Sequence, residues 1–239
     1  GTGANSITGQ CNAMGSRAFS NTAGLYGGGD FDNPKRREAV SKALGIDEKW
    51  LPQAPTITYN AIIEKAIAGE IKALWICCTN PRHSWVNNET FKKAIENLEL
   101  FIVQDIYDDT DSSEICSVYF PVTSGLYKEG VIINTERRLS KLRPVLTDKK
   151  GKLTDYEVFY KIGEALGEYY AKEGFIVVSG LASGCDTYGH RGCLNMKGQT
   201  VATLPCGLDK YYPPENCNLG DEILENEGCL ISEYKIGTN

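Results

Sequence analysis

Short apolar runs alternate with stretches of helical periodicity along most of the chain, and this alternation limits the folds that it can adopt. Apolar runs at residues 71–78, 98–103 and 118–122 are nearly continuous, which is typical of strands buried on both faces of a parallel sheet. Amphipathic stretches around them predict helices at residues 33–44, 60–68 and 88–97. Alternation of this kind predicts an open α/β sheet.

The same alternation returns after a longer helix predicted at residues 155–171. Apolar runs predict buried strands at 175–179, 200–204 and 229–232, and helices between them at 186–196 and 221–226. We therefore expect an α/β chain with two incomplete Rossmann-like modules, each an open parallel sheet. A Gly/Ser/Asn-rich region at residues 1–29 precedes them and is expected to form ordered loops or a binding surface.

Ligands of open α/β sheets bind beyond the carboxyl ends of the strands. In the first module these strand ends lead into loops at residues 79–87, 104–110 and 123–138. In the second module, the strand at 175–179 leads into the Gly-rich turn 180–184. These loops are the places where binding residues are expected.

Composition excludes several classes of protein. The chain has 239 residues, of which 41% are hydrophobic and 23% charged, as in ordinary globular domains. No apolar run approaches the roughly 18 residues of a membrane-spanning helix, and no signal peptide is recognisable, so we expect no membrane insertion and a cytoplasmic location. The net charge of −6 argues against a strongly basic nucleic-acid-binding protein.

Nine cysteines are many for this length, but no pair has the Cys-x-x-Cys spacing of a zinc or iron–sulfur site. Buried reduced thiols in a cytoplasmic protein are the simplest interpretation. Because the chain begins at Gly1 and not at methionine, we expect a fragment of a longer protein.

Four strings in residues 1–167 occur together: SITGQCNAMG (6–15), ICCTNP (76–81), IVQDIY (102–107) and KEGVIINTERR (128–138). In order and spacing they resemble the central part of molybdopterin-dependent oxidoreductases. The resemblance is strongest to assimilatory and periplasmic nitrate reductases, with formate dehydrogenases nearby. It implies a molybdenum bis-molybdopterin guanine dinucleotide cofactor and an electron-donor protein or domain as partner.

The resemblance places five residues at dinucleotide-contacting positions of that family: Asn80, Gln104, Asp105, Lys128 and Asp155. An amide both donates and accepts hydrogen bonds, and an acidic group at a strand end suits ribose hydroxyls or guanine N–H donors. A lysine supplies a point charge for a phosphate or pterin oxygen. The alternatives are a helix cap at Asp155, a solvated charge at Lys128 and loop-forming roles for the other three.

In that family the iron–sulfur cluster and the molybdenum-ligating Cys, Sec or Ser lie upstream of the matching region. We therefore expect neither a metal ligand nor a catalytic residue here, and the chain alone should not reduce nitrate. Cys11 stands where relatives often have proline, so it is not interpreted as a metal ligand. The two histidines, His83 and His190, fall in separate modules, which leaves no His-based catalytic pair.

A second set of strings lies in residues 168–239: GFIVVSGLASGCDT (174–187), HRG (190–192), TVATLPCGLD (200–209), YPPEN (212–216) and LISEY (230–234). They resemble the DNA-processing protein A (Smf) family. That family has a Rossmann-like fold, binds single-stranded DNA and helps to load a recombinase. The resemblance implies single-stranded DNA and a recombinase as partners.

Within this second resemblance the Gly-rich turn is the candidate DNA site, formed by Ser179, Gly180, Ser183 and Gly184. Backbone N–H groups at the start of the following helix would bind a phosphate, and the glycines permit close approach. The alternative is a tight turn without a ligand. Ser183 stands where many relatives have arginine. Residues 168–239 also carry 5 basic and 10 acidic groups, which oppose phosphate binding.

The two resemblances meet at Gly167 and Glu168, inside one predicted helix, so the expected domains are residues 1–167 and 168–239. A natural fusion, a chimera of two genes and a chain pieced together from separate sequences all explain this arrangement. Three functions stay open. The first is part of the dinucleotide cradle of an oxidoreductase, the second is a single-stranded DNA-binding module, and the third is a scaffold without a ligand. We favour the molybdopterin oxidoreductase as the family from which the chain derives.

Overall fold

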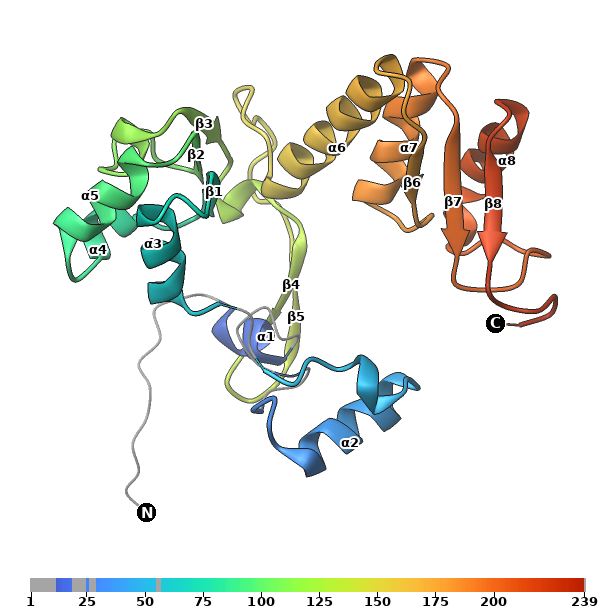
Figure 1. The fold of residues 1–239 in the computed structure, drawn as a ribbon, viewed down its shortest axis with the longest axis horizontal. Helices are drawn as coiled ribbons and strands as arrows, with labels where there is room; N and C mark the ends of the chain where they lie inside the picture. Colours follow the sequence, from blue (N-terminus) through green and yellow to red (C-terminus); the bar gives the residue numbers. More distant parts are fainter. Residues whose placement is uncertain (1–11, 19–24, 26–28, 55–56, 239) are drawn as a thin grey trace. The chain divides into compact units, whose positions relative to one another are not determined.

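The computed structural model describes residues 12–18, 25, 29–54 and 57–238, and the chain divides into two compact units, residues 1–150 and 151–239 (Figure 1). The loops predicted for residues 1–29, the string at 6–15 and Cys11 lie largely outside the described residues. The described part of that region contains a short helix, α1 (Ala13–Ala18).

Unit 1 contains a parallel three-stranded sheet in the order β1-β2-β3, made of β1 (Ala73–Cys77), β2 (Leu100–Asp105) and β3 (Val118–Pro121). Helices α3 (Tyr59–Ile67) and α5 (Asn88–Glu96) are capped by the side chains of Thr58 and Asn87. Their apolar stripes pack on one face of the sheet. All five elements lie within a few residues of the predicted ranges.

The core of this sheet lies between α3, α5 and one sheet face, where Phe91 and Phe101 meet edge to face with ring centroids 6.4 Å apart. The prediction that these strands are buried on both faces is confirmed only in part. On the opposite face Gln104 is fully buried, whereas Leu100 and Val118 are 36% and 37% exposed. A strand can have a continuous apolar sequence whether or not a second layer covers the sheet. The sequence pattern alone therefore could not predict the exposure of the second face.

A smaller cluster of unit 1 forms around helix α2 (Pro34–Leu44), which Asn33 caps, and the 3-10 helix η1 (Glu48–Trp50). Arg37 of α2 is buried and donates hydrogen bonds to the carbonyls of Phe31, Glu48, Leu51 and Pro52. Its Nε also pairs with Glu48 Oε1 at 3.0 Å. The Arg37 guanidinium therefore holds the segment that follows α2 against this helix through hydrogen bonds.

The stretch predicted as a loop at residues 123–138 contains β4 (Gly130–Ile133), which pairs with β5 (Leu139–Leu142), just after that stretch, in an antiparallel hairpin. Ile133 N donates to Asn12 Oδ1 at 2.8 Å, which joins the hairpin to the start of α1. Three short helices complete the unit: α4 (Pro81–Ser84), η2 (Ser113–Ile115) and η3 (Gly125–Tyr127).

Unit 2 contains a second parallel sheet in the order β6-β7-β8, made of β6 (Val177–Ser179), β7 (Thr200–Leu204) and β8 (Cys229–Ser232). Its helices are α6 (Asp155–Lys172), α7 (Cys185–Asn195) and α8 (Cys217–Glu225), with the 3-10 helix η4 (Pro214–Asn216) before α8. Leu181, Leu194, Ala202, Leu204, Leu219 and Ile223 belong to its core.

Two details of unit 2 differ from prediction. The strand predicted as buried at 175–179 begins only at Val177, and Val178 is 62% exposed because one face of the sheet is open. The cap of α6 is Thr154, which forms a capping box with Glu157, and Asp155 is the first helical residue. The alternative of a cap at Asp155 was therefore wrong by one residue.

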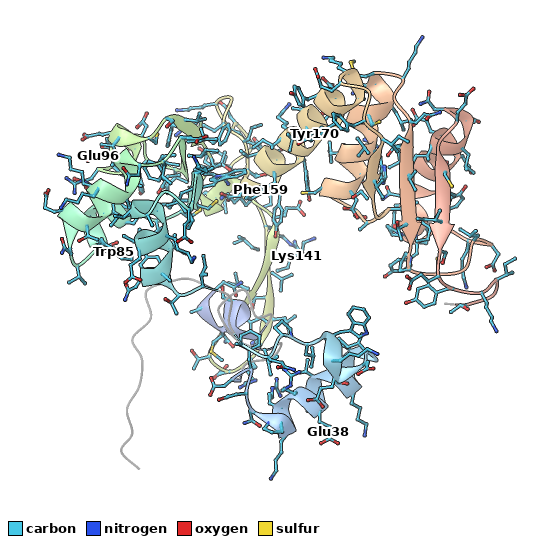
Figure 2. All side chains as sticks on the ribbon, viewed as in Figure 1. Glu38, Trp85, Glu96, Lys141, Phe159 and Tyr170 are labelled. Carbon is cyan, nitrogen blue, oxygen red and sulfur yellow. The ribbon has the colours of Figure 1, made fainter. Side chains whose placement is uncertain are left out.

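Helices α6 and α7 lie side by side and touch through glycines (Figures 1 and 2). A Cβ atom on Gly167 would overlap the carbonyl oxygen of Gly189, and one on Gly192 would overlap that of Glu164. The predicted domain boundary at residues 167 and 168 falls inside α6, whereas the division into compact units lies at Lys150 and Gly151.

The α/β class with parallel sheets is confirmed, while the Rossmann-like topology stays a prediction. In the described residues no helix has the length and apolar character needed to cross a membrane. The same residues contain no group of three or more His, Cys, Asp and Glu placed to hold a metal ion.

Candidate functional site

The carboxyl ends of the three strands of unit 1 come together around the end of β2. Cys78 N donates to the carbonyl of Gln104 at 2.8 Å, and Val122 N donates to that of Asp105 at 3.0 Å. Gln104 is fully buried and Asp105 is 8% exposed. Two of the predicted binding residues therefore lie at the centre of the edge where ligands of such sheets bind.

Asp105 closes the end of β2. Its Oδ1 accepts hydrogen bonds from Ile106 N at 2.6 Å and from Tyr107 N at 3.4 Å. Its carbonyl accepts the Tyr119 hydroxyl at 2.8 Å. Burial first, and then the nearby carboxylates of Asp108 and Asp105, raise the pKa of Tyr119 to about 12. The phenol thus stays protonated and holds β3 to β2.

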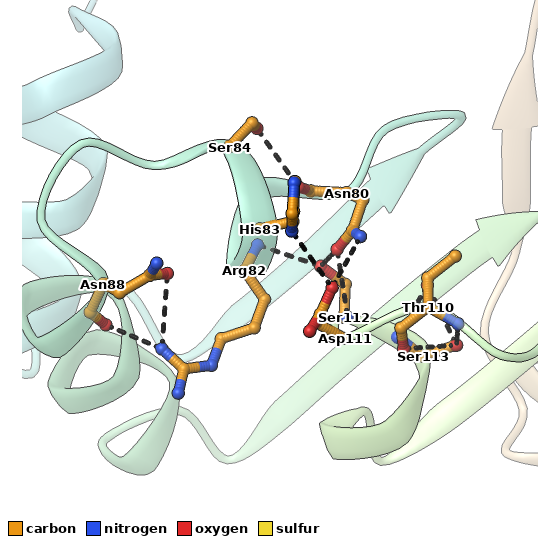
Figure 3. Close-up of polar contacts among 9 residues, drawn as sticks. All are labelled: Asn80, Arg82, His83, Ser84, Asn88, Thr110, Asp111, Ser112 and Ser113. Carbon is orange, nitrogen blue, oxygen red and sulfur yellow. Dashed lines mark hydrogen bonds and ion pairs between the residues drawn. The ribbon is translucent and has the colours of Figure 1, made fainter.

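Asn80 joins the loop after β1 to the loop after β2 (Figure 3). Its Oδ1 accepts from Ser112 N at 3.1 Å and from Ser112 Oγ at 2.7 Å, and its Nδ2 donates to Asp111 Oδ2 at 3.1 Å. Ser112 is fully buried, and its Oγ also accepts from Arg82 N at 3.0 Å. These contacts use both lone pairs of the Asn80 oxygen and leave one amide proton for another partner.

Three titratable groups, Asp111, His83 and Arg82, surround this junction (Figure 3). The hydrogen bond from Asn80 is the main cause that lowers the pKa of Asp111, and the charges of His83 and Arg82 contribute less. His83 Nδ1 lies 3.6 Å from Asp111 Oδ2, and Arg82 donates to the Asn88 carbonyl at 3.0 Å. The edge of the sheet therefore carries both signs of charge.

Thr123, immediately after β3 and Val122, is a polar residue of this edge that the sequence analysis did not single out. It is 2% exposed, and its Oγ1 has no hydrogen-bond partner among the described residues. Leaving a buried hydroxyl unsatisfied costs about 1–3 kcal/mol. Its place directly after an apolar run was the signal that could have identified it.

The other two predicted cofactor residues are Lys128 and Asp155. Lys128 is half-buried after η3, where its N–H donates to the Gly125 carbonyl at 3.4 Å. Asp155 opens α6 and belongs to unit 2. The structure therefore groups Asn80, Gln104 and Asp105 at one edge of the sheet of unit 1.

In unit 2, side chains hold three consecutive carbonyls of the predicted DNA-binding turn. His190 Nε2 lies 2.5 Å from the Gly180 carbonyl, and Asn216 Nδ2 donates to that of Leu181 at 2.7 Å. Thr187 Oγ1 donates to the Ala182 carbonyl at 2.9 Å. His190 is fully buried, and Thr187 and Asn216 are 7% exposed, so the backbone of this turn is rigidly fixed.

Asp186 supports the same turn from the first turn of α7. Its Oδ1 accepts the Ser179 hydroxyl at 2.8 Å, and its Oδ2 accepts Ala182 N at 3.2 Å. The N-cap of α7 is Gly184, with φ 107° and ψ −130°, and it provides no side-chain cap. The first N–H groups of α7 are therefore available to an anion, while the Ser179 hydroxyl is already engaged.

His190 is a supporting residue of the turn. Because a carbonyl only accepts, the Gly180 contact requires a proton on Nε2. Thr200 Oγ1 lies 2.6 Å from Nδ1 and 2.7 Å from the Val177 carbonyl, and its single hydrogen serves one of the two. Burial lowers the pKa of His190, which favours the neutral ring. The contacts of His190 and Asn216 join residues 10 and 35 positions apart, which no sequence spacing reveals.

Comparison with known proteins gives two matches. Residues 3–165 match the family model of molybdopterin oxidoreductases, and residues 154–239 match that of DNA recombination-mediator protein A. Both matches include the first half of α6. Both resemblances inferred from the sequence are confirmed.

Relatives of the first match include a nitrate reductase of Klebsiella oxytoca, 30% identical over 70% of this chain and 19% of that protein. For the second match, protein Smf of a Synechocystis strain is 46% identical over 33% of this chain and 18% of that protein. A solved structure of DNA processing protein A from Streptococcus pneumoniae is 34% identical over 35% of this chain and 29% of that chain, with a TM-score of 0.31.

The chain thus spans about a fifth of the length of the curated relatives it matches. Its C-terminal part, residues 154–239, resembles DNA recombination-mediator protein A. Through residues 3–165, which are more than half of its length, the chain belongs to the molybdopterin oxidoreductase family.

Proposed function

We propose that unit 1 forms part of a cradle for a molybdopterin guanine dinucleotide in an oxidoreductase of the nitrate reductase type. The observation that carries this proposal is the buried hydroxyl of Thr123, whose oxygen lacks a partner in the described residues at a strand end beside Gln104 and Asp105. A dinucleotide offers hydroxyl, amide and phosphate groups, and these fit the donors and acceptors present at this edge.

Each residue of the edge would then have a specific role. The remaining amide proton of Asn80 would donate to the ligand, and the Asp105 carboxylate would accept a ribose hydroxyl or a guanine N–H. Lys128 would contribute a positive charge, as the family resemblance implies. When bound, the cofactor supplies a redox-active molybdenum, and the residues named here hold and orient its nucleotide.

Titration of the purified chain with guanosine diphosphate tests this proposal. We expect binding, and we expect Thr123→Val to weaken it about 3- to 10-fold because one hydrogen bond is worth about 0.5–1.5 kcal/mol. Thr203→Val is the matched control, because Thr203 is exposed on β7 in unit 2. Equal affinities of the two variants, or no binding by the unmodified chain, would contradict the proposal.

A second function, single-stranded DNA binding by unit 2, is favoured by the fixed turn at residues 180–184. Side chains hold its carbonyls, which leaves the uncapped start of α7 to a backbone phosphate. The partner protein of unit 2 would be a recombinase. The partner of unit 1 would be an electron-donor protein or domain. Anisotropy of a labelled single strand tests DNA binding, with a steep loss of affinity expected as salt is added.

A further inference from the structure

Three tyrosines and an arginine form a continuous row on α6 and α7, which we name the tyrosine ladder: Tyr156, Tyr160, Tyr188 and Arg191. Tyr156 and Tyr160 stack with ring centroids 6.2 Å apart and an interplanar angle of 29°. Tyr160 and Tyr188 are almost parallel, with centroids 4.9 Å apart and an angle of 5°. The Arg191 guanidinium lies 5.8 Å from the centroid of Tyr188.

The ladder lies directly beside the turn of unit 2. A Cβ atom built on Gly184 would be 3.2 Å from Cε1 of Tyr160, so this ring lies against the N-cap of α7. Gly184 has positive φ as well, a conformation that favours glycine. A phosphate bound at the start of α7 would therefore bring its nucleotide within reach of the rings.

Packing between α6 and α7 does not explain why Tyr156, the outermost ring of the ladder, stacks on Tyr160. Glycine contacts already hold α6 to α7, and Tyr160 with Tyr188 covers the seam between them. Tyr156 is 68% exposed, so its stacking on Tyr160 buries little apolar surface. The tyrosines at the other end of α6 differ, because Tyr169 meets Tyr170 edge to face, at 72°.

We propose that the exposed ring of Tyr156, at the outer end of the tyrosine ladder, is a stacking platform for a base of a single-stranded nucleic acid whose backbone lies at the Gly180–Gly184 turn. The inference rests on the proposed DNA-binding function of unit 2 and names the part of the site that binds a base. A base stacks on an exposed aromatic ring without regard to sequence. Tyr160, Tyr188 and Arg191 stack in turn behind Tyr156 and leave its outer face for the base. The platform also supplies affinity that does not depend on net positive charge.

The test compares two labelled strands of about twelve nucleotides, within the usual range of site sizes. One is oligothymidylate, and the other is an abasic strand with the same number of phosphates. Fluorescence anisotropy is measured with the full chain at low salt. We expect tighter binding of oligothymidylate, and we expect Tyr156→Leu to reduce that affinity about 5- to 100-fold without changing the affinity for the abasic strand.

Tyr169→Leu is the matched control, because it removes another exposed tyrosine from the same helix outside the ladder, and it should bind both strands like the unmodified chain. Tyr156→Trp should bind oligothymidylate at least as tightly as the unmodified chain. Equal affinities of the unmodified chain for both strands would contradict base stacking on the ladder but would agree with phosphate binding at the turn. Absence of binding to either strand would overturn both the ladder and the DNA-binding function.

Discussion

Thr123 has a buried hydroxyl that lacks a partner among the described residues, and this combination separates a binding role from a structural one. A residue kept for stability should destabilise the fold when it is changed. Here we expect Thr123→Val to leave the free energy of unfolding unchanged or to raise it by about 1 kcal/mol, because an unsatisfied polar group is removed. Urea unfolding measures this, and a loss of 2 kcal/mol or more would show that the hydroxyl stabilises the fold.

His190 makes the stability of unit 2 depend on pH. Burial lowers its pKa from the usual value of 6.5, while the Gly180 carbonyl and Asp186 act in the opposite direction. Below pH 6.5 the unfolded chain therefore binds a proton that the folded chain resists. We expect the free energy of unfolding to fall between pH 7.5 and pH 5.5, by at most about 1.4 kcal/mol per pH unit.

Urea titrations of the full chain across that range measure the effect. His190→Gln should flatten the dependence, and His83→Gln should preserve it, because His83 is exposed on unit 1 and the chain has only these two histidines. An unchanged pH dependence in His190→Gln would assign the effect to other groups.

At the level of elements, helices α6 and α7 approach closely because the residues at their contact are glycines, which have a hydrogen atom in place of a side chain. Gly192→Ala would place a methyl group against the backbone of Glu164, whereas Gly189→Ala meets open space in the same helix. We expect Gly192→Ala to destabilise unit 2 by about 1–3 kcal/mol or more through overpacking. Gly189→Ala should be neutral or stabilising by up to about 1 kcal/mol, since alanine favours helix. Thermal unfolding of the pair distinguishes steric overlap from helix propensity.

The elements themselves were largely readable from the sequence, since periodicity located α2, α3, α5, α6 and all six strands of the two parallel sheets within a few residues. The hairpin of β4 and β5 was missed, because β4 lies inside a segment that had been assigned to a binding loop and β5 follows directly after it. Burial was overestimated for Val178 and Leu100, because apolar character does not specify how many layers cover a sheet.

For the whole molecule, the division at Lys150 and Gly151 predicts where the chain separates. Residues 143–152 are largely exposed and mostly outside helices and strands, so trypsin should cleave there before it cleaves inside α6. Residues 151–239 should keep their helical circular dichroism after cleavage. A fragment of residues 168–239 should lose it, because it lacks the first half of α6, including Glu164 at the α7 contact. First cleavage within α6 would contradict this division.

The family resemblances, the α/β class and the strand ends that carry Asn80, Gln104 and Asp105 followed from the sequence alone, because motif spacing and apolar periodicity are local properties. The tertiary structure decided which polar groups those ends bring together. It linked Asn80 to Ser112, buried Thr123 without a partner in the described residues and stacked Tyr160 on Tyr188. These contacts join distant parts of the chain, and only packing determines which of them form.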